Sequence, residues 1–78
     1  MKFKELDTVV LERDLPGEGL RRGDLGAVVH LYDPDGLEVE FVTASGRTQA
    51  LVTLREGDVR SVGDEDLIAV RTVARGAA

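Results

Sequence analysis

Residues 37–41 read Leu37-Glu38-Val39-Glu40-Phe41, the most regular alternation of apolar and acidic side chains in this sequence. Successive side chains of a β-strand point to opposite faces of the sheet, so a period of two is typical of a strand with one buried face. Leu37, Val39 and Phe41 are therefore predicted to face a core. Glu38 and Glu40 are predicted to face the solvent.

Short apolar segments lie on both sides of this strand, and turn residues separate them. Pro and Gly interrupt regular structure at 15–19, and turn sequences follow at 23–26, 33–36, 44–47 and 55–58, the last with the composition of one helical turn. The strands predicted between these turns cover residues 8–11, 27–32, 37–43, 48–54 and 59–62. Five short antiparallel strands predict an all-β fold over residues 1–62, a small barrel whose closure removes exposed strand edges.

Residues 63–78 form a C-terminal extension for which the sequence allows two structures. Asp64 can cap a short helix, with Glu65 and Asp66 in its first turn. Residues 67–73 favour an added strand because most of them branch at Cβ. We expect this tail to form a strand or a short helix, partly packed on the barrel, and to fray at residues 75–78.

The composition is that of one small globular domain. The chain has 78 residues, of which 42% are hydrophobic and 32% are charged. The sequence has no cysteine, which excludes disulfides and thiol chemistry. Its first residues are charged, unlike a signal peptide, and no apolar run reaches the roughly 20 residues of a membrane helix. We therefore expect a soluble cytoplasmic domain that does not enter a membrane.

The residue types that catalysis and metal binding require are sparse. His30, the one histidine, lies in a predicted strand without a nucleophile motif nearby. Glu38 and Glu40 share a strand face, which a solvated outer surface explains better than an acid–base pair. Asp33-Pro34-Asp35-Gly36 has only the beginning of a calcium-loop pattern, and turn chemistry explains it. The sequence thus predicts no enzymatic activity, no metal site and no cofactor.

One segment provides a nucleic-acid alternative. Residues 19–28, Gly-Leu-Arg-Arg-Gly-Asp-Leu-Gly-Ala-Val, resemble a KOW-type segment, in which a glycine-bounded loop runs into a valine-rich strand. This resemblance implies an SH3-like barrel, as in ribosomal and transcription-elongation proteins. Arg21 and Arg22 are the adjacent basic pair of this segment, but a net charge of -5 opposes binding to polyanions. A KOW-like module on RNA or on the transcription or translation machinery is therefore the alternative function.

A longer resemblance covers residues 3 to about 62. The stretches that carry it are Phe3-Lys4-Glu5-Leu6-Asp7, Arg13-Asp14-Leu15-Pro16, Gly23-Asp24-Leu25-Gly26-Ala27-Val28-Val29, Val39-Glu40-Phe41 and Asp58-Val59-Arg60. In this order and spacing they resemble the small bacterial family catalogued as domain of unknown function 4926. The resemblance implies a stand-alone SH3-like barrel with no established activity. Relatives encoded beside toxin-like genes imply an antitoxin or immunity role.

The predicted binding surface is the long loop at residues 12–22, with the outer face of the sheet expected nearby. A loop of this length is uncommon unless it packs on itself or carries a function. The candidate partner-binding residues are Asp14, Glu18, Arg21, Arg22, Glu38 and Glu40. The structural alternative is that Leu15 and Leu20 close one end of the barrel while the charges keep the loop hydrated.

These observations favour a non-enzymatic protein that binds another protein. Its acidity complements a basic partner, as in the inhibition of a nucleic-acid-cleaving toxin. A third possibility is an accessory or scaffold protein that uses an exposed strand edge. The identity of the partner, the binding face and the oligomeric state stay open.

Overall fold

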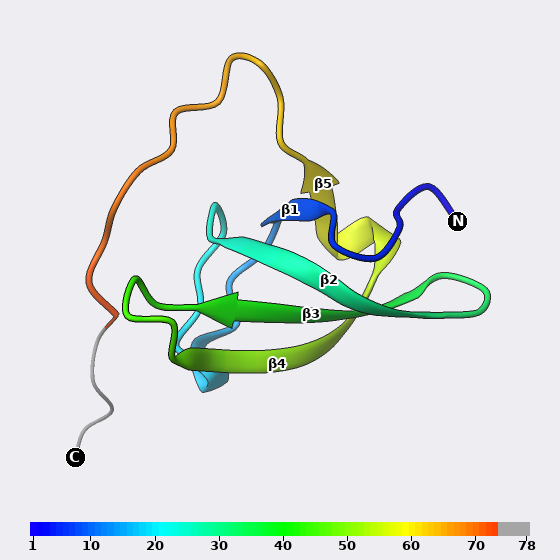
Figure 1. Ribbon diagram of the computed structural model, residues 1–78, viewed down its shortest axis with the longest axis horizontal. Helices are drawn as coiled ribbons and strands as arrows, with labels where there is room; N and C mark the ends of the chain where they lie inside the picture. The colour runs from blue at the N-terminus through cyan, green and yellow to red at the C-terminus, as the bar shows by residue number, and fades with distance from the viewer. Residues whose placement is uncertain (74–78) are drawn as a thin grey trace.

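In the computed structural model, which describes residues 1–73, the alternating segment forms strand β3 (Gly36–Val42). It lies between β2 (Leu25–Tyr32) and β4 (Thr48–Arg55), and pairs with both of them in antiparallel register (Figure 1). Leu37, Val39 and Phe41 are buried, as their period of two predicts. The strand that the sequence indicates most clearly is therefore confirmed, with its predicted register.

The remaining strands extend the same sheet. β1 (Thr8–Leu11) pairs with β2 on one side and with β5 (Val59–Ser61) on the other, which gives the sheet order β4-β3-β2-β1-β5. A short 3-10 helix at Pro16–Glu18 interrupts the β1–β2 loop, and a second one at Glu56–Asp58 precedes β5. Over residues 1–73 the protein is all-β with five antiparallel strands, and the helical turn predicted before β5 is confirmed.

The sheet is open, whereas a closed barrel was expected. The pairings described for residues 1–73 leave β4 and β5 as its two edges. β5 is three residues long and pairs with β1 over its whole length, and the 3-10 helix Glu56–Asp58 turns the chain away from β4 before β5 begins. Both edge strands therefore keep one side free of a strand neighbour.

The core is built from the inward faces of all five strands and from the loop. Its buried members are Phe3, Val9, Leu11, Leu20, Val28, Leu37, Val39, Phe41, Ala50, Leu54 and Val59. Leu20 is buried and Leu15 packs against the cluster, and the two residues form a backbone bridge across the loop. The loop at 12–22 thus covers one end of the core with its leucines, as the structural alternative for these residues predicts.

Gly26 lies inside β2 and not in the turn predicted at residues 23–26. The turn ends at Asp24, whose N–H donates to the Arg21 carbonyl at 3.0 Å. A Cβ on Gly26 would lie 2.6 Å from Val39 Cγ1 and 2.9 Å from Phe41 Cε2. This glycine therefore lets the core residues of β3 approach the backbone of β2.

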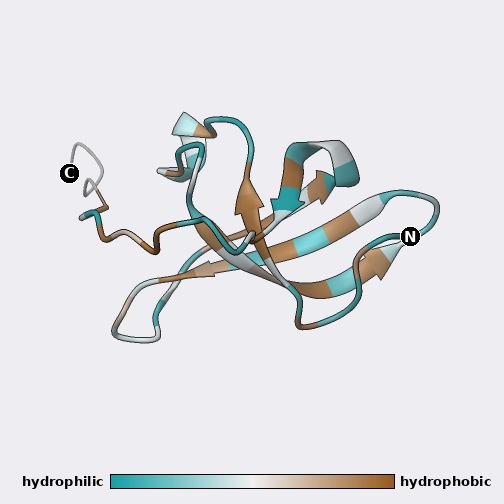
Figure 2. Ribbon diagram, turned by 90° about the horizontal axis from the view of Figure 1, so that it is seen from above, coloured by the Kyte–Doolittle hydropathy of each residue, from teal (hydrophilic) through white to brown (hydrophobic). Residues whose placement is uncertain are grey.

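As far as residue 73, the last one described, the tail forms neither the strand nor the helix that the sequence allows. After β5, one turn at 64–65 is closed by the Asp66 N–H, which donates to the Gly63 carbonyl at 3.1 Å. The helix does not continue, and residues 66–73 run as an extended, irregular segment that returns beside the β3–β4 hairpin (Figure 1). Figure 2 shows that this segment is largely hydrophobic. The frayed end expected at residues 75–78 lies outside the described residues.

Candidate protein-binding groove

Residues 66–73, called the strap below, are fixed to the sheet at their first residue. Arg60 on β5 donates from Nη1 to Asp66 Oδ2 at 2.8 Å and from Nη2 to Asp66 Oδ1 at 3.0 Å. The Gly63 N–H donates to the same carboxylate at 2.6 Å. A bidentate arginine–carboxylate pair fixes the relative orientation of the two side chains as well as the distance between them. It therefore fixes the direction of the chain after β5.

A second arginine–aspartate pair fixes the far end of the strap. Arg71 Nε donates to Asp24 Oδ1 at 2.8 Å, and Arg71 Nη2 donates to Asp24 Oδ2. The same Nη2 also donates to the Gly19 carbonyl at 3.1 Å. We call this set of three oxygens, from the Asp24 carboxylate and the Gly19 carbonyl, the arginine cradle. With Arg71 in place, the Asp24 side chain is only 18% exposed.

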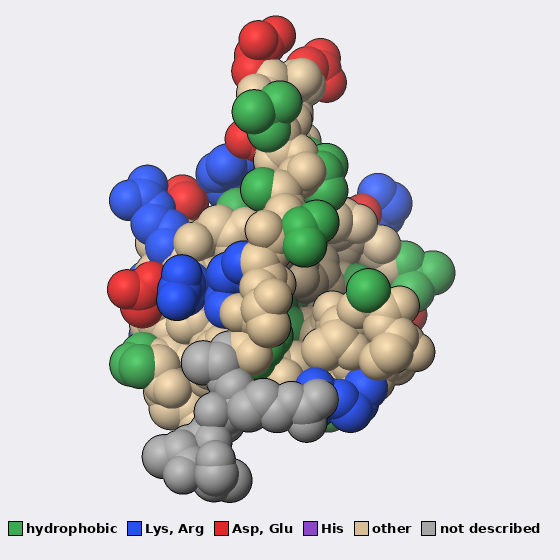
Figure 3. Space-filling view, turned by 90° about the vertical axis from the view of Figure 1, so that its left-hand side faces the viewer, with side chains coloured by type: hydrophobic (Ala, Val, Ile, Leu, Met, Phe, Trp, Pro, Cys, Tyr) green, Lys and Arg blue, Asp and Glu red, His purple; other side chains and the backbone are tan. Residues whose placement is uncertain are grey.

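Between these two anchors the strap forms one wall of a groove of about 760 Å³. Its apolar lining comes from β1, β2, β3 and the loop, and includes Val10, Leu20, Leu25 and Phe41. The turn of the β3–β4 hairpin forms another side. Figure 3 shows the strap running across this face of the molecule, with a hollow beside it. The groove has the size of a site for a small ligand or a short extended peptide.

The strap turns most of its apolar side chains to the solvent. Leu67 is 93% exposed, Ile68 is 67% exposed and Val70 is 98% exposed. Among the described residues, the backbone of residues 67–73 makes no hydrogen bond to another backbone group. An extended segment with exposed apolar side chains and unpaired backbone groups is able to accept a strand or an apolar surface of another protein.

Both anchors are ionised through the physiological pH range. Hydrogen bonds from Arg60 and from the Gly63 N–H lower the pKa of Asp66 to about 2. Burial alone would raise the pKa of Asp24, but hydrogen bonds from Arg71 and from the Arg21 N–H outweigh it, and the pKa is lowered. The strap is therefore held by charge-assisted bonds at both ends.

The five-stranded sheet that carries the groove matches a known protein family. The family model described as domain of unknown function (DUF4926) matches residues 5–61. The chain belongs to the DUF4926 family. The DUF4926 segment ends with β5 at Ser61, so it includes the arginine cradle, and the strap follows it. No curated protein and no solved structure matches the chain.

The DUF4926 segment contains all six predicted partner-binding residues, and the structure divides them among separate places. Asp14 and Arg22 come together, since the Arg22 N–H donates to Asp14 Oδ1 at 2.8 Å. Glu18 is exposed at the end of the helix Pro16–Glu18, and its carbonyl accepts a bond from β4. Arg21 is also exposed, and its N–H donates to the cradle carboxylate at 2.7 Å. All four loop residues are thus tied in part to the fold, since the Glu18 N–H also donates to the Leu15 carbonyl at 2.9 Å.

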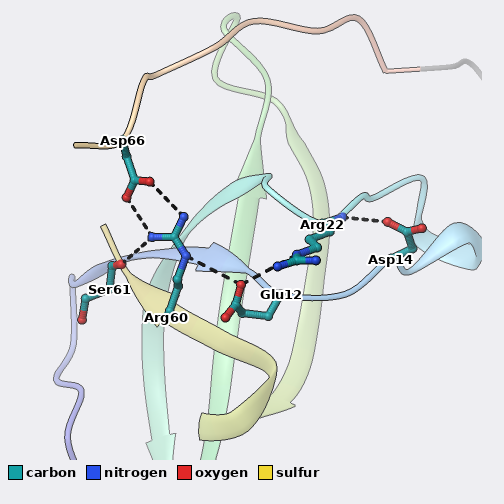
Figure 4. Close-up of polar contacts among 6 residues, drawn as sticks. All are labelled: Glu12, Asp14, Arg22, Arg60, Ser61 and Asp66. Carbon is teal, nitrogen blue, oxygen red and sulfur yellow. Dashed lines mark hydrogen bonds and ion pairs between the residues drawn. The ribbon is translucent and has the colours of Figure 1, made fainter. Parts of the chain in front are cut away.

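Alternating charges connect this loop to the strap (Figure 4). Glu12 Oε1 lies 3.6 Å from Arg60 Nε and 3.9 Å from Arg22 Nε. The chain of charges therefore runs from Asp66 through Arg60 and Glu12 to Arg22, whose backbone N–H binds Asp14. Exposed pairs of this kind contribute little stability one by one, but together they orient the side chains along the loop.

Glu38 and Glu40 lie on the outer face of the sheet, as predicted, and hydroxyl groups of β4 bind both. Thr53 Oγ1 donates to Glu38 Oε1 at 2.7 Å, and Thr48 Oγ1 donates to Glu40 Oε2 at 2.6 Å. Among residues 1–73, no hydrogen bond or ion pair joins these two carboxylates to the loop at 12–22. They form a separate surface from Asp14.

Leu6, just before β1, is an exposed apolar residue with an unusual backbone conformation. Its side chain is 82% exposed, and its φ of 74° lies in the left-handed region that L residues other than glycine rarely adopt. The Leu6 N–H donates to the Val28 carbonyl at 2.7 Å, which holds this conformation against β2. His30, also on β2, lies nearby: its ring packs edge-on against Tyr32 with centroids 4.7 Å apart.

Sequence reasoning missed the two residues that hold the far end of the strap. Asp24 and Arg71 are 47 positions apart, and no local pattern connects them. The signal that was available is the apolar run at residues 67–70, which lacks the alternating polar positions of a half-buried strand. Such a run outside the predicted barrel indicates either a fully buried strand or an exposed binding segment.

Among residues 1–73, no group of three or more His, Asp or Glu side chains is placed to hold a metal ion. No helix in this part of the chain is both long and apolar enough to span a membrane.

Proposed function

We propose that this DUF4926 protein is a non-enzymatic binding module of the cytoplasm that recognises an extended segment of a basic partner protein. The binding surface in this proposal is the groove together with the strap above it. The partner segment would add to the unpaired backbone of the strap and cover its apolar side chains, in the manner of strand addition.

The observation that carries the proposal is the exposure of Leu67, Ile68 and Val70 in one extended segment. Single exposed apolar residues are ordinary on protein surfaces, but contiguous ones beside a groove mark interaction sites. The pair Arg60–Asp66 holds the start of this segment in place, so a partner would meet that part already ordered, and less conformational entropy would be lost on binding.

Charge supports a basic partner. The chain has a net charge of -5, and the exposed Asp14 and Glu18 of the loop add acidic groups to the domain surface. Complementary charge accelerates association and selects against acidic competitors. As part of the same proposal, the partner is a basic protein of the kind that an antitoxin or immunity protein neutralises.

The exposed pair Arg21 and Arg22 favours the second candidate, a KOW-like module associated with RNA. The surroundings of this pair support protein binding more strongly. Arg22 lies beside Glu12, and the backbone N–H groups of the pair bind the carboxylates of Asp24 and Asp14. A phosphate approaching the two arginines would meet these carboxylates as well.

A capture experiment tests the proposal. The tagged full chain is incubated with an extract of its native host, and bound proteins are identified for the wild type and for the double variant Leu67→Ser/Val70→Ser. The matched control is Val29→Ser/Leu51→Ser, which changes two sheet residues that are also exposed and that do not line the groove. We expect the wild type and the control to capture one basic protein and the strap variant to lose it, with equal melting temperatures.

Retention of the partner by the strap variant would place the interface elsewhere. The charge-reversal variant Asp14→Lys/Glu18→Lys then shows whether the loop carries it, again with the melting temperature as the control for folding. Capture that depends on added RNA and on Arg21 and Arg22 would favour the KOW-like alternative.

A further inference from the structure

The arginine cradle is built to bind a guanidinium group. It offers two oxygens of Asp24 and the carbonyl of Gly19, and Arg71 meets all three with Nε and Nη2. The Arg21 N–H donates to Asp24 Oδ2 at 2.7 Å and so fixes the carboxylate in the plane that the arginine meets. A planar fork of N–H donors matches this set, whereas the single ammonium group of lysine does not.

The segment that fills the cradle is held weakly along the rest of its length. Between Asp66 and Arg71 the strap makes no backbone hydrogen bond to the sheet among the described residues, and Leu67 and Val70 are almost fully exposed. The cradle lies within the family match at residues 5–61, and Arg71 lies outside it. The acceptor groups thus belong to the part of the chain that matches the family, and the arginine comes from the segment that follows it.

We propose that the cradle is a recognition site for an arginine in an extended segment of the partner, and that Arg71 occupies it in the free protein. The strap is then an intramolecular competitor of the partner segment, and its far end leaves the cradle when a partner arginine enters. This inference rests on the proposed function and names the chemistry that its groove selects.

A peptide with the sequence of the strap provides the probe. Residues 66–73 read Asp-Leu-Ile-Ala-Val-Arg-Thr-Val, and this peptide carries the arginine at the spacing that already fits the groove. It is titrated into the full-length wild type and into Arg71→Ala, and its dissociation constant is obtained from the amide shifts of residues 19–25. Since Arg71 competes for the cradle in the wild type, we expect Arg71→Ala to bind the peptide at least about tenfold more tightly.

Two controls distinguish arginine recognition from non-specific binding of the peptide. A peptide with lysine in place of arginine is expected to bind Arg71→Ala at least about tenfold more weakly, because it cannot form the bidentate pair. Asp24→Asn in the Arg71→Ala background is expected to cause a similar loss. If this double variant does not fold, the lysine peptide alone decides the question on the folded single variant.

Equal binding of the arginine and lysine peptides, equal binding to the wild type and Arg71→Ala, or no binding to Arg71→Ala would each overturn the proposal. The titration needs no natural partner, so its outcome is independent of the capture experiment. Loss of arginine recognition with a retained dependence of capture on Leu67 and Val70 would refute the cradle and leave the proposed function standing. Arginine recognition by the cradle, together with capture that does not depend on Leu67 and Val70, would refute the proposed function.

Discussion

Arg60 and Asp66 lie six residues apart and face each other with two parallel hydrogen bonds, of 2.8 and 3.0 Å. The same guanidinium presents Nε to Glu12 Oε1 at 3.6 Å. One arginine on β5 is therefore shared between the strap and the loop at 12–22. Removing Arg60 would release two segments that are distant in sequence.

Acid is expected to free the first anchor of the strap. The pKa of Asp66 is lowered from 3.8 to about 2 in the folded protein, so its pairing stabilises the strap fully above pH 3.8 and is lost as the pH falls through about 2. The Gly63 amide, which donates to this carboxylate, should shift over that range in an NMR titration.

Asp66→Asn is the matched variant for this titration, because it removes the charge and keeps the shape of the side chain. We expect its Gly63 amide to show no transition between pH 4 and 2. An unchanged transition in Asp66→Asn would assign the titration to another carboxylate.

Phe41→Ala is expected to lower the free energy of unfolding by about 3–5 kcal/mol, because it opens a cavity among buried residues. Glu40→Ala removes one hydrogen bond from Thr48 at the surface and should cost less than about 1 kcal/mol. Urea unfolding of the two variants and the wild type measures both. A tolerant Phe41 together with a sensitive Glu40 would contradict the register of β3.

Gly26→Ala is expected to destabilise the fold by about 1–3 kcal/mol through overpacking. The added Cβ would lie 2.6 Å from Val39 Cγ1, and the core cannot move away without strain. Gly17→Ala is the control, since nothing lies within 4 Å of the position of its Cβ and its φ is not positive. That variant should be neutral or slightly stabilising in the same thermal melts.

Leu6→Gly is expected to stabilise the protein by about 0.5–1 kcal/mol, since relief of the left-handed strain outweighs the greater freedom of glycine in the unfolded chain. Leu6→Ala retains a Cβ at φ 74° and should stay within about 0.5 kcal/mol of the wild type. Denaturant midpoints compare the three proteins. Equal gains in both variants would show that exposure of the apolar side chain, and not backbone strain, is responsible.

Generic RNA and DNA are expected not to bind appreciably at physiological salt, because the chain carries a net charge of -5. A gel-shift titration measures this. Micromolar affinity that weakens with salt and is lost in Arg21→Ala/Arg22→Ala would instead support the KOW-like alternative.

The strands could be predicted because their signals are local. β3 follows from the alternation at Leu37, Val39 and Phe41, and the turns around it follow from glycine and proline. Gly26 was misplaced because a glycine in a turn and a glycine under a packed side chain look alike in one sequence. The distinction depends on Phe41, which reaches this position only after β2 and β3 pair.

The structure of the tail could not be predicted from local sequence patterns. Its β-branched residues favour a strand, but a strand needs a neighbouring edge, and Arg60 and Asp24 fix residues 66 and 71 where no edge runs alongside. The candidate site was hidden for the same reason. Asp14 and Glu18 could be identified by their charge and their loop, whereas the cradle exists only once residues 19, 24 and 71 converge.

The two anchors also give the groove a direction. If the whole strap were lifted, Asp24 would be left as a carboxylate at one end of the groove, and Arg60, 3.6 Å from Glu12, would be left as a cation without Asp66 at the other. An entering segment that carries an acidic residue five positions before an arginine satisfies both ends in one orientation only, because the reversed chain would bring like charges together. The groove would then select the direction of the partner chain before its sequence. A partner segment that enters in the opposite direction would be excluded by electrostatic repulsion alone.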